Sequence, residues 1–187
     1  MKGRFYEIVH PSCARGNSMQ DLKTRQLIER AKSRDPDAFT ELIGMHMKDM
    51  YRAAAAILRH DENAADAIQD TILTCWEKLG TLKKPEYFRT WLIRILINKC
   101  YDIRKHYAGL TGLEEIEELS GEDPCNPELK EAIASLGETY SIVMTLYYGM
   151  GYSSREIAEI LGISPGAVRV RLKRGRQKLK EYYDADR

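Results

Sequence analysis

The chain has few cysteines, and their arrangement would hold neither a disulfide framework nor a metal. The four cysteines are widely scattered with no Cys-x-x-Cys pair, and the four histidines are equally dispersed. A zinc knuckle or a small disulfide-bonded domain needs such residues in closely spaced sets. The sequence therefore predicts a protein of a reducing compartment, the cytoplasm, with no metal and no cofactor.

Long apolar runs are absent as well. No stretch approaches the length of a membrane-spanning helix, and the N-terminus lacks the apolar core of a signal peptide. With 43% hydrophobic and 30% charged residues, the 187-residue chain has the composition of a soluble protein of one or two small domains. No segment is rich in β-formers, so we expect an all-α fold without membrane insertion.

Net charge is nearly absent too, at +1, yet one segment departs from this balance. Between residues 165 and 180 the chain has no acidic residue and seven cations, namely Arg169, Arg171, Lys173, Arg174, Arg176, Lys178 and Lys180. A solvated basic face is one interpretation, but solvated faces usually mix both signs. An unbalanced run repels itself unless a polyanion is present, which favours nucleic-acid binding.

A count at 100° per residue arranges this segment as a helix with two distinct faces. One narrow stripe is predicted to face the core and consists of Val168, Leu172, Gly175 and Leu179. The outward face carries Gly166, Val170, Lys173, Arg174 and Gln177, with Arg169 toward one edge. Arg171 and Arg176 flank the buried stripe, where they could reach phosphates, and Val170 suits a thymine methyl group. The segment is typical of a helix that enters the major groove.

A shorter helix is predicted just before it. Ser153–Glu156 forms a capping box, Gly162 ends that helix, and Ser164 followed by proline begins the next, which describes a helix-turn-helix. Residues 162–166 also match the G-x-S-x-G nucleophile elbow of hydrolases. That motif requires a preceding strand and a later histidine, whereas the last histidine here is His106. We therefore interpret Ser164 as a helix cap and the chain as non-enzymatic.

The N-terminal half shows three amphipathic patterns. Apolar residues at three- and four-residue steps predict a first helix from Asp35 to Ile57, a second capped by Asp61, and a third opened by Pro85. Three such helices can bury one another's apolar stripes and form a small domain. Residues 1–20 lack this periodicity and are interpreted as a flexible leader, or as an extension upstream of a true start at Met19.

An acidic segment separates these helices from the C-terminal ones. Residues 109–126 are rich in glycine, proline and acid, with four glutamates among residues 114–118. Such a composition is typical of a linker. Two interpretations remain open, a solvated tether and a polyanionic segment that mimics nucleic acid. Asn126 and Pro127 are a cap and first-turn pair that would begin the second helical unit.

Three stretches in this order resemble the extracytoplasmic-function sigma factors, which are minimal two-domain transcription initiation factors of bacteria. They are DENAADAIQDTILTCWEKL (61–79), FRTWLIRILINKCYDIRK (88–105) and YSSREIAEILGISPGAVRVRLKRGRQKL (152–179). The resemblance covers residues 35–107 and 126–182. It implies a polymerase-binding and -10-recognising domain over residues 21–108, an acidic linker over 109–126, and a -35-reading helix-turn-helix domain over 127–187.

The resemblance also implies roles for individual residues. Binding to the clamp helices of RNA polymerase is implied for Asp66, Gln69 and Asp70. The resemblance implies that the -10 element is melted and that one of its bases is flipped out. Contact with this element is implied for Lys83, Lys84, Tyr87, Trp91, Arg94, Asn98, Tyr101, Arg104 and Lys105. Contact with the -35 element is implied for Arg155, Ser164, Arg169, Val170, Arg171, Lys173, Arg174 and Arg176. In this -10 set, cations, an amide and aromatic rings alternate along the helix, which suits binding of single-stranded DNA. Trp91 is either core or the wedge at the melted junction.

The expected function is therefore transcription initiation. The implied partners are core RNA polymerase, through its clamp helices and flap, promoter DNA and an anti-sigma factor. The alternative is a stand-alone helix-turn-helix regulator that binds operator DNA as a dimer, in which residues 35–107 would have to dimerise. Two positions depart from the family pattern, since Gly137 replaces a common proline and Ala167 a frequent threonine.

Overall fold

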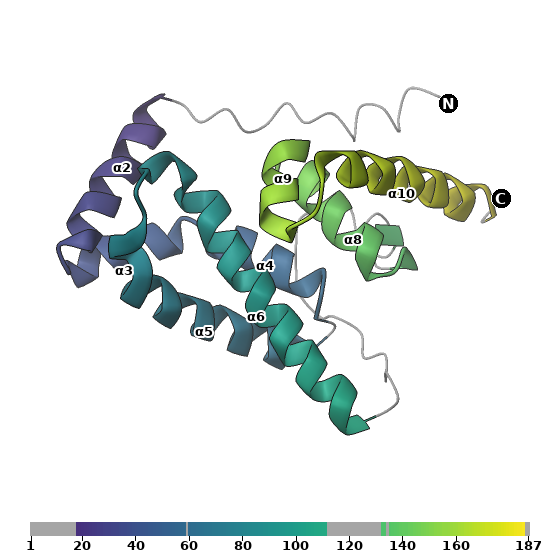
Figure 1. Cartoon of the computed structure of the whole chain (residues 1–187), viewed down its shortest axis with the longest axis horizontal. Helices are drawn as coiled ribbons and strands as arrows, with labels where there is room; N and C mark the ends of the chain where they lie inside the picture. The colour runs from purple at the N-terminus through teal and green to yellow at the C-terminus, as the bar shows by residue number, and fades with distance from the viewer. Residues whose placement is uncertain (1–17, 59, 112–131, 134, 186–187) are drawn as a thin grey trace. The chain divides into compact units, whose positions relative to one another are not determined.

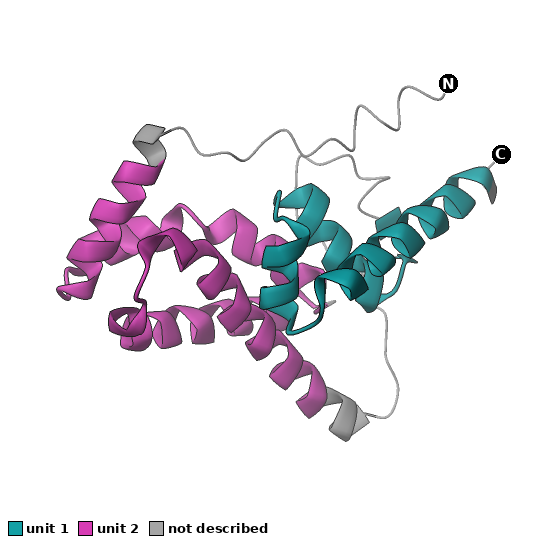
Figure 2. Ribbon diagram, turned by 45° about the horizontal axis from the view of Figure 1, so that its top comes forward, with its two compact units in different colours: residues 1–15, 122–187 teal, residues 16–121 magenta. Residues whose placement is uncertain are grey.

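The computed structural model describes residues 18–58, 60–111, 132–133 and 135–185. Every regular element in these ranges is helical, which confirms the all-α prediction (Figure 1). The ranges fall into two compact units, here called the N-terminal unit (described residues 18–111) and the C-terminal unit (described residues 132–185), coloured separately in Figure 2. Of the predicted linker, residues 112–126 lie outside the described residues, whereas residues 109–111 are helical, so the helix before the linker runs further than predicted. Of the predicted leader, residues 1–17 lie outside the described residues and residues 18–20 are helical. The pair Asn126–Pro127 also lies outside them.

The described ranges contain neither a membrane-spanning helix nor a cluster of potential metal ligands. None of the helices described combines the length and apolarity needed to cross a lipid bilayer. Among the same residues, no three His, Cys, Asp or Glu side chains come together as a metal site would require.

The N-terminal unit is built around the pairing of two long helices. Its elements are α2 (Ser18–Lys32), α3 (Pro36–Gly44), α4 (Met47–Ala55), α5 (Asp61–Lys78), the 3-10 turns η1 (Leu79–Thr81) and η2 (Pro85–Tyr87), and α6 (Phe88–Thr111). Helices α5 and α6 pack along each other, and α4 packs on both. Helix α2 packs on α3 and on the two turns. The apolar face of α6 is fully covered, with Phe88, Leu92, Ile93, Leu96 and Ile97 nearly inaccessible to solvent.

The first predicted helix is in fact two. Helix α3 ends at Gly44, and α4 begins at Met47 after an irregular turn in which the His46 N–H donates to the Ile43 carbonyl at 2.9 Å. Gly44 stabilises a helix interior poorly, so a break there costs little. Because α3 packs on α2 whereas α4 packs on α5 and α6, the break lets each short helix face different neighbours.

Three further differences concern one additional helix and the starts of two others. Helix α2 was not predicted, since few of its residues are apolar. Asp61 does not cap α5, because its Oδ1 accepts a hydrogen bond from the Tyr51 hydroxyl at 2.9 Å, and the cap position is His60. Pro85 opens η2 rather than α6 itself.

Two cysteines lie in the core of the N-terminal unit. Cys75 on α5 and Cys100 on α6 are fully buried and free. Burial disfavours the thiolate and raises the pKa of each thiol to about 12. These thiols are therefore packing residues, not nucleophiles or metal ligands.

The C-terminal unit is a compact group of short helices closed by one long one. Its elements are α8 (Glu138–Met144), the single π-helical turn η3 (Thr145–Gly149), α9 (Ser154–Leu161) and α10 (Pro165–Ala185). Helix α10 packs on α8 and α9. The closest approach is at Gly175, where an added Cβ would lie 3.1 Å from the Met144 Sδ. The absence of a side chain at Gly175 thus lets α8 cross α10 at short range.

The helix ends predicted at Ser153, Gly162 and Ser164 are confirmed. The Ser153 hydroxyl accepts from the Glu156 N–H at 3.3 Å, and the Glu156 carboxylate accepts from the Ser153 N–H at 2.8 Å. Gly162 ends α9 with a left-handed φ of 65°, a conformation that costs glycine little. The Ser164 hydroxyl accepts from the Ala167 N–H at 3.1 Å and starts α10. The sequence thus forms a helix-turn-helix, and Ser164 is a cap.

Candidate nucleic-acid and polymerase-binding surfaces

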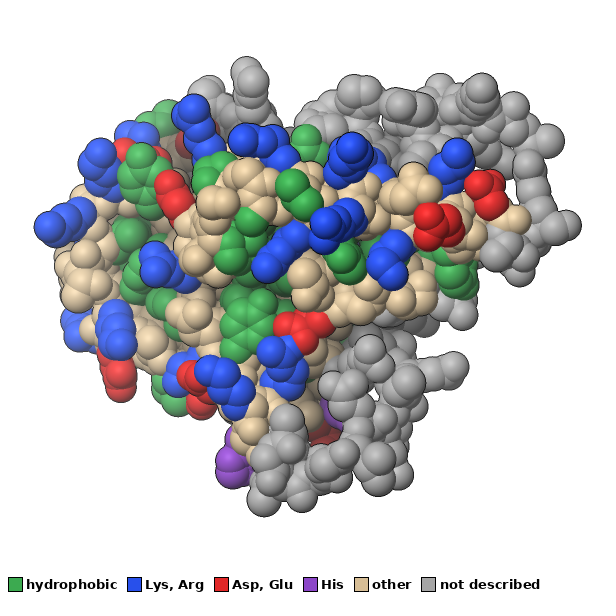
Figure 3. All heavy atoms as spheres, turned by 45° about the vertical axis from the view of Figure 1, so that its right-hand side comes forward, with side chains coloured by type: hydrophobic (Ala, Val, Ile, Leu, Met, Phe, Trp, Pro, Cys, Tyr) green, Lys and Arg blue, Asp and Glu red, His purple; other side chains and the backbone are tan. Residues whose placement is uncertain are grey.

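The long helix α10 separates a buried stripe from a cationic outer face. The residues predicted to face the core are all buried, namely Val168, Leu172, Gly175 and Leu179. Of the predicted outward residues, Lys173, Arg174 and Gln177 are exposed and Gly166 is half-buried. Val170 is an apolar side chain left 49% exposed. The surface view shows Lys and Arg side chains recurring over the face drawn, with several acidic side chains interspersed among them (Figure 3).

Most cations of this surface make no ion pair with any acid that the structure describes. Within the described part of the chain, no ion pair is made by Arg155, Arg169, Arg171, Lys173 or Arg174. Arg171 is half-buried, whereas the other four are exposed. A surface with uncompensated cations and exposed amide and methyl groups can bind the phosphates and base edges of duplex DNA.

Arg176 lies differently from the other cations. Its Nη1 donates to the hydroxyl of Tyr148, in η3, at 3.0 Å. Tyr148 therefore sets the direction of this guanidinium, although the arginine stays exposed and retains further donors. Sequence reasoning did not find Tyr148, since the two residues are 28 apart and no local pattern connects them.

A second surface runs along η2 and α6 in the N-terminal unit. Its members follow one another at three- and four-residue steps, which places them on one helical face: Tyr87, Trp91, Arg94, Asn98, Tyr101 and Lys105. Arg94, Asn98 and Lys105 are exposed, and Tyr101 is half-buried. The guanidinium of Arg104 lies 5.0 Å from the centroid of the Tyr101 ring. The pattern alternates cations with flat side chains on which bases can stack.

The loop before α6 adds an exposed aromatic and two lysines. Lys83 and Lys84 are exposed, and Tyr87 is 51% exposed. The Lys84 Nζ lies 5.7 Å from the centroid of the Tyr87 ring. An unburied ring beside one ammonium group, with a second exposed lysine in the same loop, suits an unstacked base with its phosphate.

Trp91 lies between the core and this surface. Its ring is half-buried, and its centroid lies 6.1 Å from that of the fully buried Phe88. One edge of the indole is therefore packed while the rest remains accessible. Trp91 is thus partly a core residue, and its role as a wedge stays a prediction.

A third surface lies on α5. Asp66, Gln69 and Asp70 are exposed as predicted, and Leu73 continues the same face while 63% exposed. Asp70 also reaches across to α6, where its Oδ2 lies 3.5 Å from the Lys99 Nζ. Leu73 was not singled out from the sequence, although its spacing from Gln69 and Asp70 indicated the shared face. An apolar side chain bordered by acids is suited to a partner with both apolar and basic groups.

The structure places these sets in two different units. The residues of the second and third surfaces share the N-terminal unit, on α6 and α5 respectively. The residues of the α10 surface, together with Arg155 of α9 and Ser164, all belong to the C-terminal unit.

Comparison with known proteins agrees with this division. The chain matches the family model for Sigma-70 region 2 over residues 42–108 and that for Sigma-70 region 4 over residues 127–179. It is 31% identical over 183 residues to the RNA polymerase sigma factor CnrH of Cupriavidus metallidurans, a match that covers 87% of this chain and 95% of CnrH. It is 27% identical over 182 residues to the ECF RNA polymerase sigma factor SigW of Bacillus subtilis, covering 86% and 97% of the two chains.

Two solved structures of sigma factors also match this chain. The structure of CnrH in complex with the cytosolic domain of CnrY matches with a TM-score of 0.67 and 28% identity, over 88% of this chain and 99% of that one. The sigma factor RpoE of Bartonella quintana, in complex with the anti-sigma factor NepR, shares the fold with a TM-score of 0.70 and 21% identity, over 80% and 98%.

The region 2 match accounts for the N-terminal unit that a stand-alone dimeric regulator would have needed for dimerisation, and the regulator alternative is therefore wrong. The chain belongs to the extracytoplasmic-function sigma factors, and it is a transcription initiation factor that directs RNA polymerase to specific promoters.

Proposed function

We propose that the three surfaces divide the work of promoter recognition among them. Helix α10 reads the -35 element, η2 and α6 hold the melted -10 strand, and α5 docks on core RNA polymerase. The observation that carries the proposal is the chemistry of α10, whose cations Arg169, Lys173 and Arg174 are exposed and have no ion-pair partner among the described residues. Duplex DNA supplies the missing negative charge.

At the -35 element, the N-terminal part of α10 enters the major groove. Arg169, Lys173 and Arg174 donate to base edges, and Val170 packs on a thymine methyl group. Arg155, Arg171 and Arg176 bind backbone phosphates on either side, which fixes the register of the helix on the duplex. The Ser164 oxygen is occupied by its cap, but its hydroxyl proton is free to be donated to a phosphate.

At the -10 element, the exposed stripe of α6 binds the unpaired strand. Tyr101 and Tyr87 offer ring faces, Asn98 offers an amide, and Arg94 and Lys105, with Arg104 and the loop residues Lys83 and Lys84, neutralise phosphates. The exposed ring of Tyr87 receives the flipped base, and the accessible edge of Trp91 supports the end of the remaining duplex.

The α5 surface binds the clamp helices of the polymerase. Asp66, Gln69 and Asp70 accept from basic and polar groups, and Leu73 supplies an apolar anchor at the centre. The ion pair between Asp70 and Lys99 is a surface pair, worth less than about 1 kcal/mol. Asp70 can therefore exchange Lys99 for a polymerase cation at little cost.

The remaining assignments follow from the family. Two similar solved structures show sigma factors bound by the partner proteins CnrY and NepR. We extend this to an anti-sigma factor for the present chain, to a contact of the C-terminal unit with the polymerase flap, and to action in the cytoplasm. No step in this mechanism requires bond chemistry by the chain, so we assign it no enzymatic activity.

Capture of core RNA polymerase by the purified chain tests the assignment of α5. Asp66→Lys and Leu73→Asp should each lower capture at least about tenfold, since each places an unpaired charge in the docked interface. Lys78→Glu is the matched control, because it reverses a charge on an exposed position of the same helix but on a different face. Circular dichroism should show unchanged folding for all three. Normal capture by both surface variants would overturn the assignment.

A further inference from the structure

Helix α2 has no role in the proposed function, yet one of its cations stands apart from the rest. Its four cations are Lys23, Arg25, Arg30 and Lys32. Three are paired, Lys23 with Glu41 at 2.6 Å, Arg30 with Asp35 at 2.7 Å, and Lys32 with Glu29 at 3.0 Å. Arg25 is exposed and makes no hydrogen bond or ion pair within the described residues. Among the four cations of α2, Arg25 is therefore the one available to bind a partner molecule.

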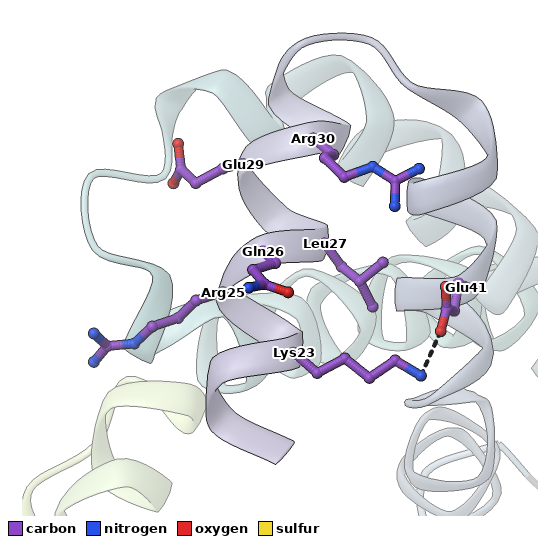
Figure 4. A pocket seen from close by; sticks show the side chains of 7 residues that line it. All are labelled: Lys23, Arg25, Gln26, Leu27, Glu29, Arg30 and Glu41. Atoms are coloured by element: carbon purple, nitrogen blue, oxygen red, sulfur yellow. Dashed lines mark ion pairs between the residues drawn. The ribbon is translucent and has the colours of Figure 1, made fainter. Parts of the chain in front are cut away.

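The direction of Arg25 follows from the packing of α2. Leu27, Ile28 and Ala31 are buried and define the inner face of the helix. Lys23 lies on the flank next to α3, where it meets Glu41. Figure 4 shows Arg25 extending from the opposite side of α2, away from Lys23 and Glu41.

The neighbours of α2 identify what lies beside that flank. Besides α3, the helix packs on the turns η1 and η2. Because α3 covers the flank of Lys23, we place the turns beside the flank of Arg25. The loop that joins and continues these turns presents exposed Lys83 and Lys84 and the 51% exposed ring of Tyr87. Arg25 therefore extends the cationic, aromatic surface at the start of α6.

We propose that Arg25 binds a backbone phosphate of the unpaired -10 strand, next to the nucleotide held at Tyr87, so that α2 is a further DNA-binding element. The inference rests on the proposed function of η2 and α6. A guanidinium that no acid among the described residues engages can offer paired donors to a phosphate without first breaking an ion pair. Glu29, the acid one turn further along α2, is held by Lys32 and does not compete.

The test is the binding of polymerase holoenzyme, assembled with the full chain, to a fork-junction DNA whose unpaired strand has a randomised sequence. A phosphate contact does not depend on sequence, so the randomised strand is a sufficient probe. Arg25→Gln should weaken binding about threefold or more and lower the slope of log affinity against log salt by about 0.7, the loss expected for one single-strand phosphate. Arg25→Lys should retain most of the affinity.

Lys23→Gln is the matched control, because it removes the same charge from the opposite flank of the same helix. It should leave both the affinity and the salt slope near wild type. Capture of core polymerase should be equal for all variants. Equal salt slopes for Arg25→Gln and Lys23→Gln would overturn the inference, and so would a loss of polymerase capture by Arg25→Gln.

Two variants of the -10 surface separate this inference from the proposed function. Tyr87→Ala and Arg94→Gln should weaken binding of the same probe. If they do so while Arg25→Gln binds normally, the role of α2 is wrong and that of α6 stands. If Tyr87→Ala and Arg94→Gln also bind normally, the proposed -10 surface itself is wrong.

Discussion

The guanidinium of Arg34 donates a hydrogen bond to the carbonyl oxygen of Trp76 at 3.1 Å and lies 5.2 Å from the centroid of the same residue's indole ring. That carbonyl belongs to the last turn of α5, where helices have carbonyl groups without intrahelical partners. The indole also meets the ring of Phe39 on α3, with 4.8 Å between centroids. Arg34 thus links the α2–α3 connection to the C-terminal end of α5, the helix that carries the proposed polymerase-binding residues.

Removal of this contact should destabilise the N-terminal unit. Arg34→Ala loses the hydrogen bond and the ring contact while it keeps the left-handed φ of 66°, and should lower the free energy of unfolding by about 1 kcal/mol. Arg34→Gly loses the same contacts but adopts that φ without strain, so it should be less destabilised. Urea unfolding followed by circular dichroism measures both. Wild-type stability of Arg34→Ala would contradict the role given to the contact.

His46 should make the fold sensitive to mild acid. Its Nε2 is buried without a hydrogen-bond partner among the described residues, and its ring centroid lies 5.4 Å from that of Phe88. Burial lowers the pKa of His46, opposed by the charge of Asp49 and supported by that of Arg89. In the folded state His46 therefore binds a proton only at a lower pH than in the unfolded state, where it does so near the ordinary histidine pKa of 6.5. The unfolded state is then the more protonated one, so the free energy of unfolding should fall as the pH drops below that value.

Substitution of His46 isolates this effect. His46→Phe should reduce the loss of unfolding free energy between about pH 7.5 and about pH 5.5, because the group that must be protonated is gone. Parallel urea titrations at the two pH values give the comparison. An identical pH dependence in wild type and variant would exclude His46 as its source.

The base-reading role of α10 predicts a change in sequence preference. Arg169→Ala and Arg174→Ala should each cost about 1–3 kcal/mol of binding to the preferred -35 sequence and relax the preference at one position. Competition binding by holoenzyme to duplexes with single base-pair changes measures this. Unchanged preference in both variants would remove these residues from the readout.

Arg176 should behave as a phosphate contact that Tyr148 holds in place. Arg176→Ala should weaken binding to all sequences alike and lower the salt slope by about 0.9, the value for one duplex phosphate. Tyr148→Phe removes only the hydroxyl that accepts from Arg176, so it should produce a smaller loss of the same kind. A sequence-selective loss in Arg176→Ala would instead place its side chain at a base edge.

What the sequence predicted well was local. The capping box at Ser153 and the left-handed end at Gly162 depend on residues within a few positions of one another, and both are confirmed. The buried stripe of α10 follows from helical periodicity alone. Since the cations lie on the same helix, their exposure could be predicted with the stripe.

What the sequence did not predict depends on contacts between distant residues. Asp61 has the chemistry of a cap, but Tyr51 binds its carboxylate and no local rule anticipates this. The break after Gly44 serves the packing of α3 and α4 on different neighbours. The accessibility of Leu73 could not be known before the neighbours of α5 were placed, although its face could.

Transcription in vitro from purified components tests the central claim most directly. Core RNA polymerase is supplied with fragmented genomic DNA from the source organism, with and without the chain, and the 5′ ends of the transcripts are sequenced. The chain should generate transcripts that begin at discrete sites preceded by shared -35 and -10 elements, and the Leu73→Asp variant should not. Transcript ends that are the same in position and amount with and without the chain would contradict the assignment of this protein as a promoter-specific initiation factor.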